Sequence, residues 1–189
     1  MSKVKKIQEL EDFIHRQELE LKKMKVVLAE MMGQGSTQAV DYAIKAQEVG
    51  REATSDEGKV IEGVFDGQNM IGPDGKVYSV PANYASKSKL AEGDILKLVI
   101  DGQGNFIYKQ IGPVERKRLM GVLARDQDKG DYIVVVDDHL FRVLTASITY
   151  YKGEEGDQVV ILVPKDADSK WAAVENIIKR SLFPNQSYN

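Results

Sequence analysis

The chain has 189 residues, of which 42% are apolar, and a net charge of −3. This length allows one large domain or two small ones, and the mild acidity argues against a general polyanion binder, which is usually basic. The absence of cysteine excludes disulfides, thiolate metal sites and thiol nucleophiles. The two histidines, His15 and His139, lie far apart in sequence, so we expect no metal site and no cofactor.

The sequence predicts a soluble, cytoplasmic protein. Residues 1–6 are rich in lysine and lead into glutamate-rich sequence, whereas a secretory signal would continue into an apolar core. No apolar run approaches the roughly 20 residues that a membrane-spanning helix needs.

Residues 4–32 predict a helix, because they contain no glycine or proline and are rich in Glu, Lys, Leu and Met. Apolar residues recur with a heptad spacing, which is typical of a coiled coil. With Ile7 at position a, the a and d positions are Ile7, Leu10, Ile14, Gln17, Leu21, Met24, Leu28 and Met31. We therefore predict a coiled-coil helix over residues 1–33 that assembles the chain into a homo-oligomer.

Charged residues beside these positions favour parallel pairing. Lys6 with Glu11, and Glu20 with Lys25, occupy g and e positions, where opposite charges bridge neighbouring helices. The alternative is a single amphipathic helix packed on its own domain. Apolar residues outside a and d support it: Leu19 and Val26 at f, and Phe13 and Val27 at g. Either way the helix needs a partner surface, because isolated helices of this length are marginal in water.

Residues 34–58 predict a short helix and a linker. Gly33 and Gly35 would end the first helix, Ser36 could cap a second, and Gly50 would end it. Residues 51–58 are polar and predict a linker.

The remaining sequence contains a degenerate repeat. Residues 60–111 and 119–177 carry the same landmarks in the same order, which indicates one supersecondary unit used twice. The landmarks are a glycine after the first apolar residues (Gly63, Gly121), an acidic turn before an aromatic-x-Val strand (74–80, 137–143) and a Glu-Gly-Asp turn (92–94, 155–157). We predict units at 59–117 and 118–180, followed by a tail at 181–189.

Each unit has the outline of an OB-type barrel, with about five short strands and a connector before the fourth. The connectors are residues 82–90 and 145–152, and the β-branched runs 132–136 and 159–163 predict strands. An SH3-like barrel pair and one fused sandwich are the alternatives. The predicted fold class is mainly β with an N-terminal α-helix.

The sequence carries no catalytic signature, so we expect a protein that is not an enzyme. Residues 72–76 lack the spacing of a phosphate-binding loop, and residues 137–139 align with a hairpin turn of the first repeat. Asp126, Asp128 and Asp131 lack the central glycine and distal glutamate of a calcium loop. The Glu-Gly-Asp turn occurs twice, which favours a structural role.

RNA is the alternative partner. Candidate nucleic-acid contacts are Tyr84, Lys87 and Lys89, because OB barrels bind single strands through aromatic and cationic side chains. Residues 58–118 carry nine basic and seven acidic residues, whereas residues 119–189 carry eight and eleven. The competing interpretation is that the lysines are solvated and that Tyr78, Phe106 and Phe141 belong to the cores.

A coiled-coil helix followed by two small β-barrels resembles the N-terminal region of bacterial proteasomal ATPases. The resemblance covers residues 4–177 and its motifs are residues 93–98 and 121–123. It implies oligomer scaffolding and capture of a protein partner; motor activity is not implied, because no Walker motif is present. Single repeats are also similar to OB domains of translation initiation and S1-type RNA-binding proteins. The sequence thus predicts an oligomeric scaffold that presents two barrels to a protein partner.

Overall fold

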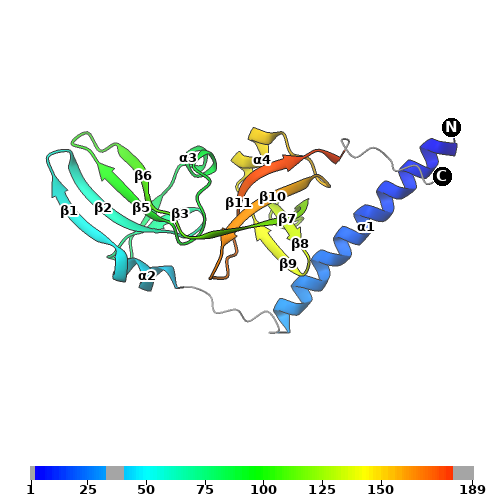
Figure 1. Cartoon of the computed structure of the whole chain (residues 1–189), viewed down its shortest axis with the longest axis horizontal. Coiled ribbons are helices and arrows are strands. Elements are labelled where there is room, and N and C mark those ends of the chain that lie inside the picture. Colours follow the sequence, from blue (N-terminus) through cyan, green and yellow to red (C-terminus); the bar gives the residue numbers. More distant parts are fainter. Residues whose placement is uncertain (1–2, 33–40, 181–189) are drawn as a thin grey trace.

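The computed structural model describes residues 3–32 and 41–180. Within these ranges the chain forms a long helix, a short second helix and two antiparallel sheets, each accompanied by a small helix (Figure 1). The expected class, mainly β with an N-terminal helix, is confirmed. The helix predicted over residues 4–32 is α1, Lys3–Met31.

The first sheet has the strand order β4-β3-β2-β5-β6, with β1 paired to β2. Its strands are β1 (Arg51–Ser55), β2 (Gly58–Phe65), β3 (Asn69–Ile71), β4 (Val77–Ser79), β5 (Ile95–Ile100) and β6 (Phe106–Gly112). Helix α3 (Ala82–Lys87) lies in the connector between β4 and β5. The core is apolar, with Ile61, Phe65, Met70, Leu96 and Leu98 at its centre.

The second sheet has the order β11-β10-β7-β8-β9. Read from its other edge, as β9-β8-β7-β10-β11, this order matches that of the first sheet strand by strand. Its strands are β7 (Arg116–Arg125), β8 (Tyr132–Val136), β9 (His139–Arg142), β10 (Gln158–Pro164) and β11 (Ala173–Ile178). Helix α4 (Thr145–Tyr151) lies between β9 and β10, as α3 lies between β4 and β5. Apart from the extra strand β1, the two strand orders are the same, so the predicted duplication is confirmed.

Neither sheet closes into a barrel through continuous strand pairing. In the first, the Tyr108 hydroxyl on β6 donates to the carbonyl of Ser79 on β4, at 2.8 Å. In the second, one parallel bridge joins Arg142 of β9 to Trp171, just before β11. The predicted closed barrels are therefore not observed. No strand pairing joins β4 to β6, and a single bridge joins β9 to the segment before β11.

Gly63 and Gly121 occupy equivalent places in β2 and β7. Gly63 pairs with Leu96 and Gly121 pairs with Val159, and both partners lie two residues after the aspartate of the Glu-Gly-Asp turn. A Cβ at Gly63 would lie 2.2 Å from the carbonyl oxygen of Ile71, and one at Gly121 would lie 2.4 Å from that of Val135. The next strand thus passes too close for any side chain, which explains the repeated glycine.

The two Glu-Gly-Asp turns have the structural role that their repetition predicts. Asp94 accepts hydrogen bonds from the backbone amides of Ala91 and Val114, both at 2.9 Å. Asp157 accepts them from Glu154 at 2.9 Å and Arg180 at 3.1 Å. Both aspartates are buried. Each therefore fastens its turn to the segment that follows the last strand of its sheet.

The structure corrects the prediction for residues 34–58. Helix α2 is Tyr42–Val49; Asp41 caps it by accepting from Ala43 and Ile44, and Gly50 ends it as expected. Residues 51–55 form β1 and are not a linker, because their backbone pairs with residues 58–62 of β2. All five side chains of β1 are exposed, so no hydrophobic alternation marked the strand. Gly33, Gly35, Ser36 and the predicted tail lie outside the described residues.

Candidate assembly interface

Helix α1 exposes its predicted coiled-coil residues. The apolar side chains at the a and d positions, which we call the heptad face, are between 49% (Ile7) and 81% (Met31) exposed. They are Ile7, Leu10, Ile14, Leu21, Met24, Leu28 and Met31. Gln17, at the remaining d position, is exposed as well. An exposed apolar face of this size is a candidate interaction surface.

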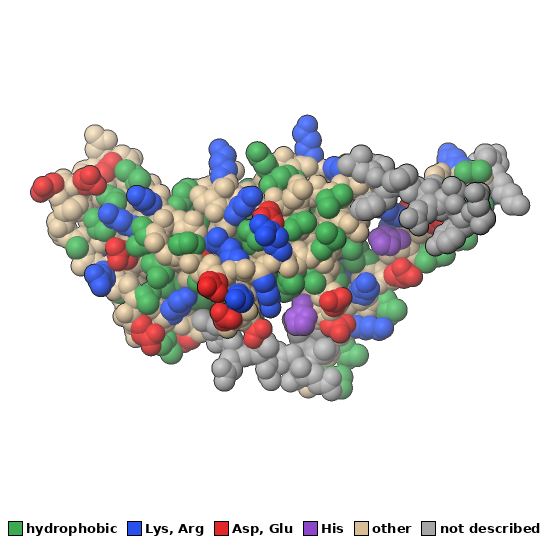
Figure 2. All heavy atoms as spheres, viewed as in Figure 1, with side chains coloured by type: hydrophobic (Ala, Val, Ile, Leu, Met, Phe, Trp, Pro, Cys, Tyr) green, Lys and Arg blue, Asp and Glu red, His purple; other side chains and the backbone are tan. Residues whose placement is uncertain are grey.

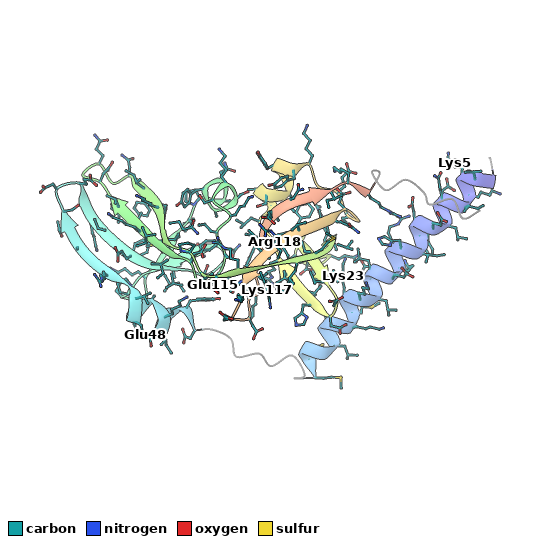
Figure 3. The ribbon with its side chains drawn as sticks, viewed as in Figure 1. Lys5, Lys23, Glu48, Glu115, Lys117 and Arg118 are labelled. Carbon is teal, nitrogen blue, oxygen red and sulfur yellow. The ribbon has the colours of Figure 1, made fainter. Side chains whose placement is uncertain are left out.

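A different side of α1 contacts the second sheet. Leu19 is 8% exposed and packs against Ala124, Ile133 and Val135. The Lys23 ammonium group donates to the carbonyl of Arg125, at 2.7 Å, and Lys23 lies on the side of α1 that faces this sheet (Figure 3). We call Asp12, Leu19 and Lys23 the docked face, because Asp12 also pairs with Arg180, at 2.9 Å.

Asp12 and Leu19 of the docked face lie opposite the heptad face, and Lys23, at position c, lies about 130° from it. Each residue advances the helix by about 100°, so the f position of Asp12 and Leu19 is about 170° from the midpoint between a and d. Docking on the second sheet therefore leaves the heptad face free to contact another molecule.

The single-helix alternative describes part of the structure, and self-association through the heptad face stays a prediction. Leu19 packs on the chain's own sheet, as the single-helix alternative expects. Phe13 and Val27, which that alternative also predicts to pack there, are exposed. Docking also uses Glu20, which pairs with Lys23 at 2.7 Å instead of remaining free for Lys25.

Glu92 joins the two sheets. Its carboxylate accepts the Tyr42 hydroxyl of α2 at 2.6 Å, and the backbone amides of Lys170 and Trp171 at 3.0 and 2.7 Å. Glu92 is only 4% exposed, and this burial raises its pKa even though the three hydrogen bonds lower it. Burial and the contact with Glu92 likewise raise the pKa of Tyr42.

Two further contacts strengthen this junction. The Trp171 ring packs on Gly67, where an added Cβ would lie 2.4 Å from it. Helices α3 and α4 lie side by side (Figure 1), and the Ser147 hydroxyl donates to that of Ser86 at 2.9 Å. Leu144, which precedes α4, packs against the core of the first sheet. The two sheets therefore form one connected platform.

The candidate nucleic-acid residues do not form a common cationic surface. Tyr84 is half-buried against the first core and stacks on Tyr108, with ring centroids 6.2 Å apart. Lys87 is exposed, whereas Lys89 is half-buried. Figure 2 shows acidic and basic side chains interspersed over the visible face of the sheets.

One aromatic feature was missed by the sequence analysis. Phe106, expected in a core, is 49% exposed. It contacts Tyr78 and Tyr108 at centroid distances of 6.4 and 6.5 Å, so four rings including Tyr84 run from α3 across β6 to β4. Phe141, by contrast, lies in the second core as predicted. The alternation of Phe106 and Tyr108 on one strand was the available signal.

Among residues 3–32 and 41–180, no group of three or more histidine, aspartate or glutamate side chains could hold a metal ion. Over the same described parts, no helix has the length and apolar character to cross a membrane. Comparison of the chain with protein-family profiles, with curated proteins and with solved structures gave no match.

Proposed function

We propose that the protein is a non-enzymatic, oligomeric scaffold that self-associates through α1 and presents its two sheets to a protein partner. The observation that carries the proposal is the exposed heptad face, opposite the docked face. Each of its seven half-exposed apolar side chains contributes about 1 kcal/mol when it becomes fully buried. Together they favour association of α1 helices over exposure to water.

We also propose that each sheet is an incomplete OB barrel. If the five strands of each unit are numbered along the chain, as β2 to β6 and β7 to β11, both sheets have the order 5-4-1-2-3 with a helix between the third and fourth strands. This arrangement supports the assignment. The parallel bridge between Arg142 and Trp171 joins the third strand of the second sheet, β9, to the segment just before its fifth strand, β11, where an OB barrel closes. This element order is also the support for the resemblance to the N-terminal region of proteasomal ATPases, and thus for a scaffold that captures proteins.

Placing charge in the heptad face should dissociate the oligomer. In Ile14→Asp with Leu21→Asp, association would bury carboxylates, at a cost of several kcal/mol for each that stays ionised. Sedimentation velocity should show an oligomer for the wild type and a smaller species for the variant. The circular dichroism of the sheets should be unchanged, because neither residue contacts a sheet core.

The matched control is Gln8→Glu with Lys22→Glu, which places two carboxylates at exposed b positions of the same helix. This control should keep the wild-type mass. A wild-type protein that is monomeric at tens of micromolar would contradict the proposed function.

RNA binding is the second candidate, and the four-ring aromatic path with exposed Phe106 favours it. An RNA site here would be strongly dependent on salt, because lysines that contact phosphates release counterions. Stacking of a base on Tyr84 would be worth about 1–3 kcal/mol.

We expect no RNA binding in either the wild type or the Lys87→Glu with Lys89→Glu variant, because the second sheet is acidic and Lys89 is half-buried. Fluorescence anisotropy with a labelled single-stranded RNA at physiological salt measures this directly. Tight binding by the wild type that the double variant loses would favour the second candidate instead.

A further inference from the structure

The two sheets differ at the place where an OB-type barrel would close. In the second sheet, the amide of Arg142 donates to the carbonyl of Lys170 at 2.8 Å, and the amide of Ala172 donates to the carbonyl of Arg142 at 2.9 Å. Residues 170–172 therefore lie along β9 as a short segment parallel to it. In the first sheet, no backbone hydrogen bond joins β4 to β6 within residues 41–180. We call these two unpaired edges, which the Tyr108 side chain connects, the seam.

The length of one loop explains this difference. In the second sheet, eight residues (165–172) connect β10 to β11, and the last three of them lie along β9. In the first sheet, only five residues (101–105) connect β5 to β6. The Asp101 carboxylate accepts the amides of Gln103 and Asn105, both at 2.9 Å, and holds these five residues in a tight turn. The shorter loop therefore makes no backbone hydrogen bond to β4.

Ser79 occupies in β4 the position that Arg142 occupies in β9. Each directly follows the aromatic residue that pairs with the middle of the preceding strand. In an antiparallel pair, the backbone groups of alternate residues bond the partner strand or point away from it. The carbonyl of Ser79 points away from β3, because it accepts the Tyr108 hydroxyl of β6 at 2.8 Å. This hydroxyl thus takes the place of the backbone amide that Ala172 supplies in the second sheet.

Aromatic rings and a groove lie beside the seam. Phe106 is 49% exposed and contacts Tyr78 across the seam, at a centroid distance of 6.4 Å. Ser79 is exposed as well, and a groove of about 240 Å³ adjoins it between β3, α3 and Leu144. A chain that entered here would find a backbone carbonyl to pair with and apolar surface for a side chain.

We propose that the seam of the first sheet binds an extended segment of the protein partner, which adds to β4 as residues 170–172 add to β9. This inference rests on the proposed presentation of the sheets to a protein partner and names the site. The occupant is an extended peptide because the duplicated unit holds one in this position, with backbone hydrogen bonds to the equivalent residue. In strand addition, main-chain hydrogen bonds give affinity and side-chain contacts give specificity. Phe106 and Tyr78 select a segment with an aromatic or aliphatic side chain beside the paired residue.

A peptide that copies residues 166–174 tests the proposal, because it contains the segment that closes the second sheet. With a fluorescein label, its anisotropy should rise to saturation as the full-length protein is added. The peptide with Ala172→Pro lacks the amide that would donate to Ser79 and should bind about tenfold more weakly. The peptide with Ala167→Pro is the control, since residue 167 lies outside the paired segment, and should bind as the unmodified peptide does.

Two results of this titration would overturn the proposal. One is the absence of saturable binding of the unmodified peptide up to about 1 mM, the weak end of measurable affinity. The other is equal binding of the unmodified and Ala172→Pro peptides, which would show that strand pairing is not the mode of recognition.

Tyr108→Phe supplies a second measurement. The wild-type hydroxyl occupies the Ser79 carbonyl that the incoming amide needs, so the two compete. The variant removes the hydroxyl and keeps the ring that stacks on Tyr84. It should bind the unmodified peptide several-fold more tightly than the wild type. Weaker binding would contradict the proposal, because the hydroxyl would then belong to the binding site.

Phe106→Ala locates the site on the protein. Phe106 is exposed and lies outside the first core, so the variant should fold and should bind the peptide several-fold more weakly. Ile107→Ala is the matched control, because Ile107 is 56% exposed on the other face of the same strand, and it should bind as the wild type does. Equal binding by Phe106→Ala, or binding of labelled single-stranded RNA in place of the peptide, would overturn the proposal. A monomeric protein in sedimentation would contradict the proposed self-association alone and would leave the peptide titration unaffected.

Discussion

Asp94→Ala should destabilise the first sheet by about 3–5 kcal/mol, the range for removal of one member of a buried ion pair. Asp94 is completely buried and accepts hydrogen bonds from the backbone amides of Ala91 and Val114 and from the side chain of Gln110, at 2.8–2.9 Å. It also pairs with the guanidinium group of Arg116. The alanine variant leaves all four donor groups without this acceptor.

The measurement is urea denaturation followed by circular dichroism and by the fluorescence of Trp171, the single tryptophan. Trp171 packs on Gly67 at the junction of the sheets, so its emission reports whether the junction survives.

Glu155→Ala is the control for this experiment, because it changes an exposed carboxylate in the second copy of the same motif. Its free energy of unfolding should stay within about 0.5 kcal/mol of the wild type, as is usual for surface substitutions. Asp157→Ala, the counterpart of Asp94→Ala, should destabilise the second sheet strongly. A loss below about 1 kcal/mol for Asp94→Ala would show that the turn is not held by this carboxylate.

Gly63→Val and Gly121→Val should each destabilise their own sheet by about 3 kcal/mol, the upper end of ordinary overpacking. An added Cβ would overlap the carbonyl oxygen of Ile71 or Val135, at 2.2 and 2.4 Å. The strand must then move, because a backbone carbonyl cannot rotate away as a side chain does. Thermal and urea unfolding of each variant measure the loss.

Gly102→Val is the matched control, since a Cβ at Gly102 has no neighbour within 4 Å. It should change the free energy of unfolding by less than about 0.5 kcal/mol. If Gly121→Val behaved like Gly102→Val, the close approach of β7 and β8 would not be a requirement of the fold.

Short-range patterns allowed much of the fold to be predicted. Helix α1 follows from an uninterrupted run of helix-forming residues with apolar heptads, and the two sheets follow from landmarks repeated in the same order. Gly63, Gly121 and the Glu-Gly-Asp turns were predicted to be structural because they recur. These features are local, since a period or a turn signature depends on residues close together in the sequence.

Residues 51–55 show where local patterns fail. They are polar and exposed, and they became a strand only because β2 offered backbone groups for pairing. Strand formation by such a segment depends on its neighbour and not on its own side chains.

Helix α1 likewise has one property that its sequence determines and one that depends on distant residues. Its sequence determined that an apolar face exists, with Phe13 and Val27 on its g edge. Only the tertiary structure decided that Leu19 docks on the second sheet and that the heptad face stays exposed, because the partner residues Ala124, Ile133 and Val135 lie more than a hundred positions away.

The two Glu-Gly-Asp motifs show most clearly which properties follow from the sequence and which follow from the tertiary structure. The sequence by itself determined that both form structural turns, and the hydrogen bonds showed that Asp94 and Asp157 hold them in the same way. It did not distinguish Glu92 from Glu155, which occupy the same place in the motif. The tertiary structure buries Glu92 under Tyr42, Lys170 and Trp171 and leaves Glu155 in solvent, because only the first turn meets the other sheet. A contact between distant segments leaves no period or spacing in either of them.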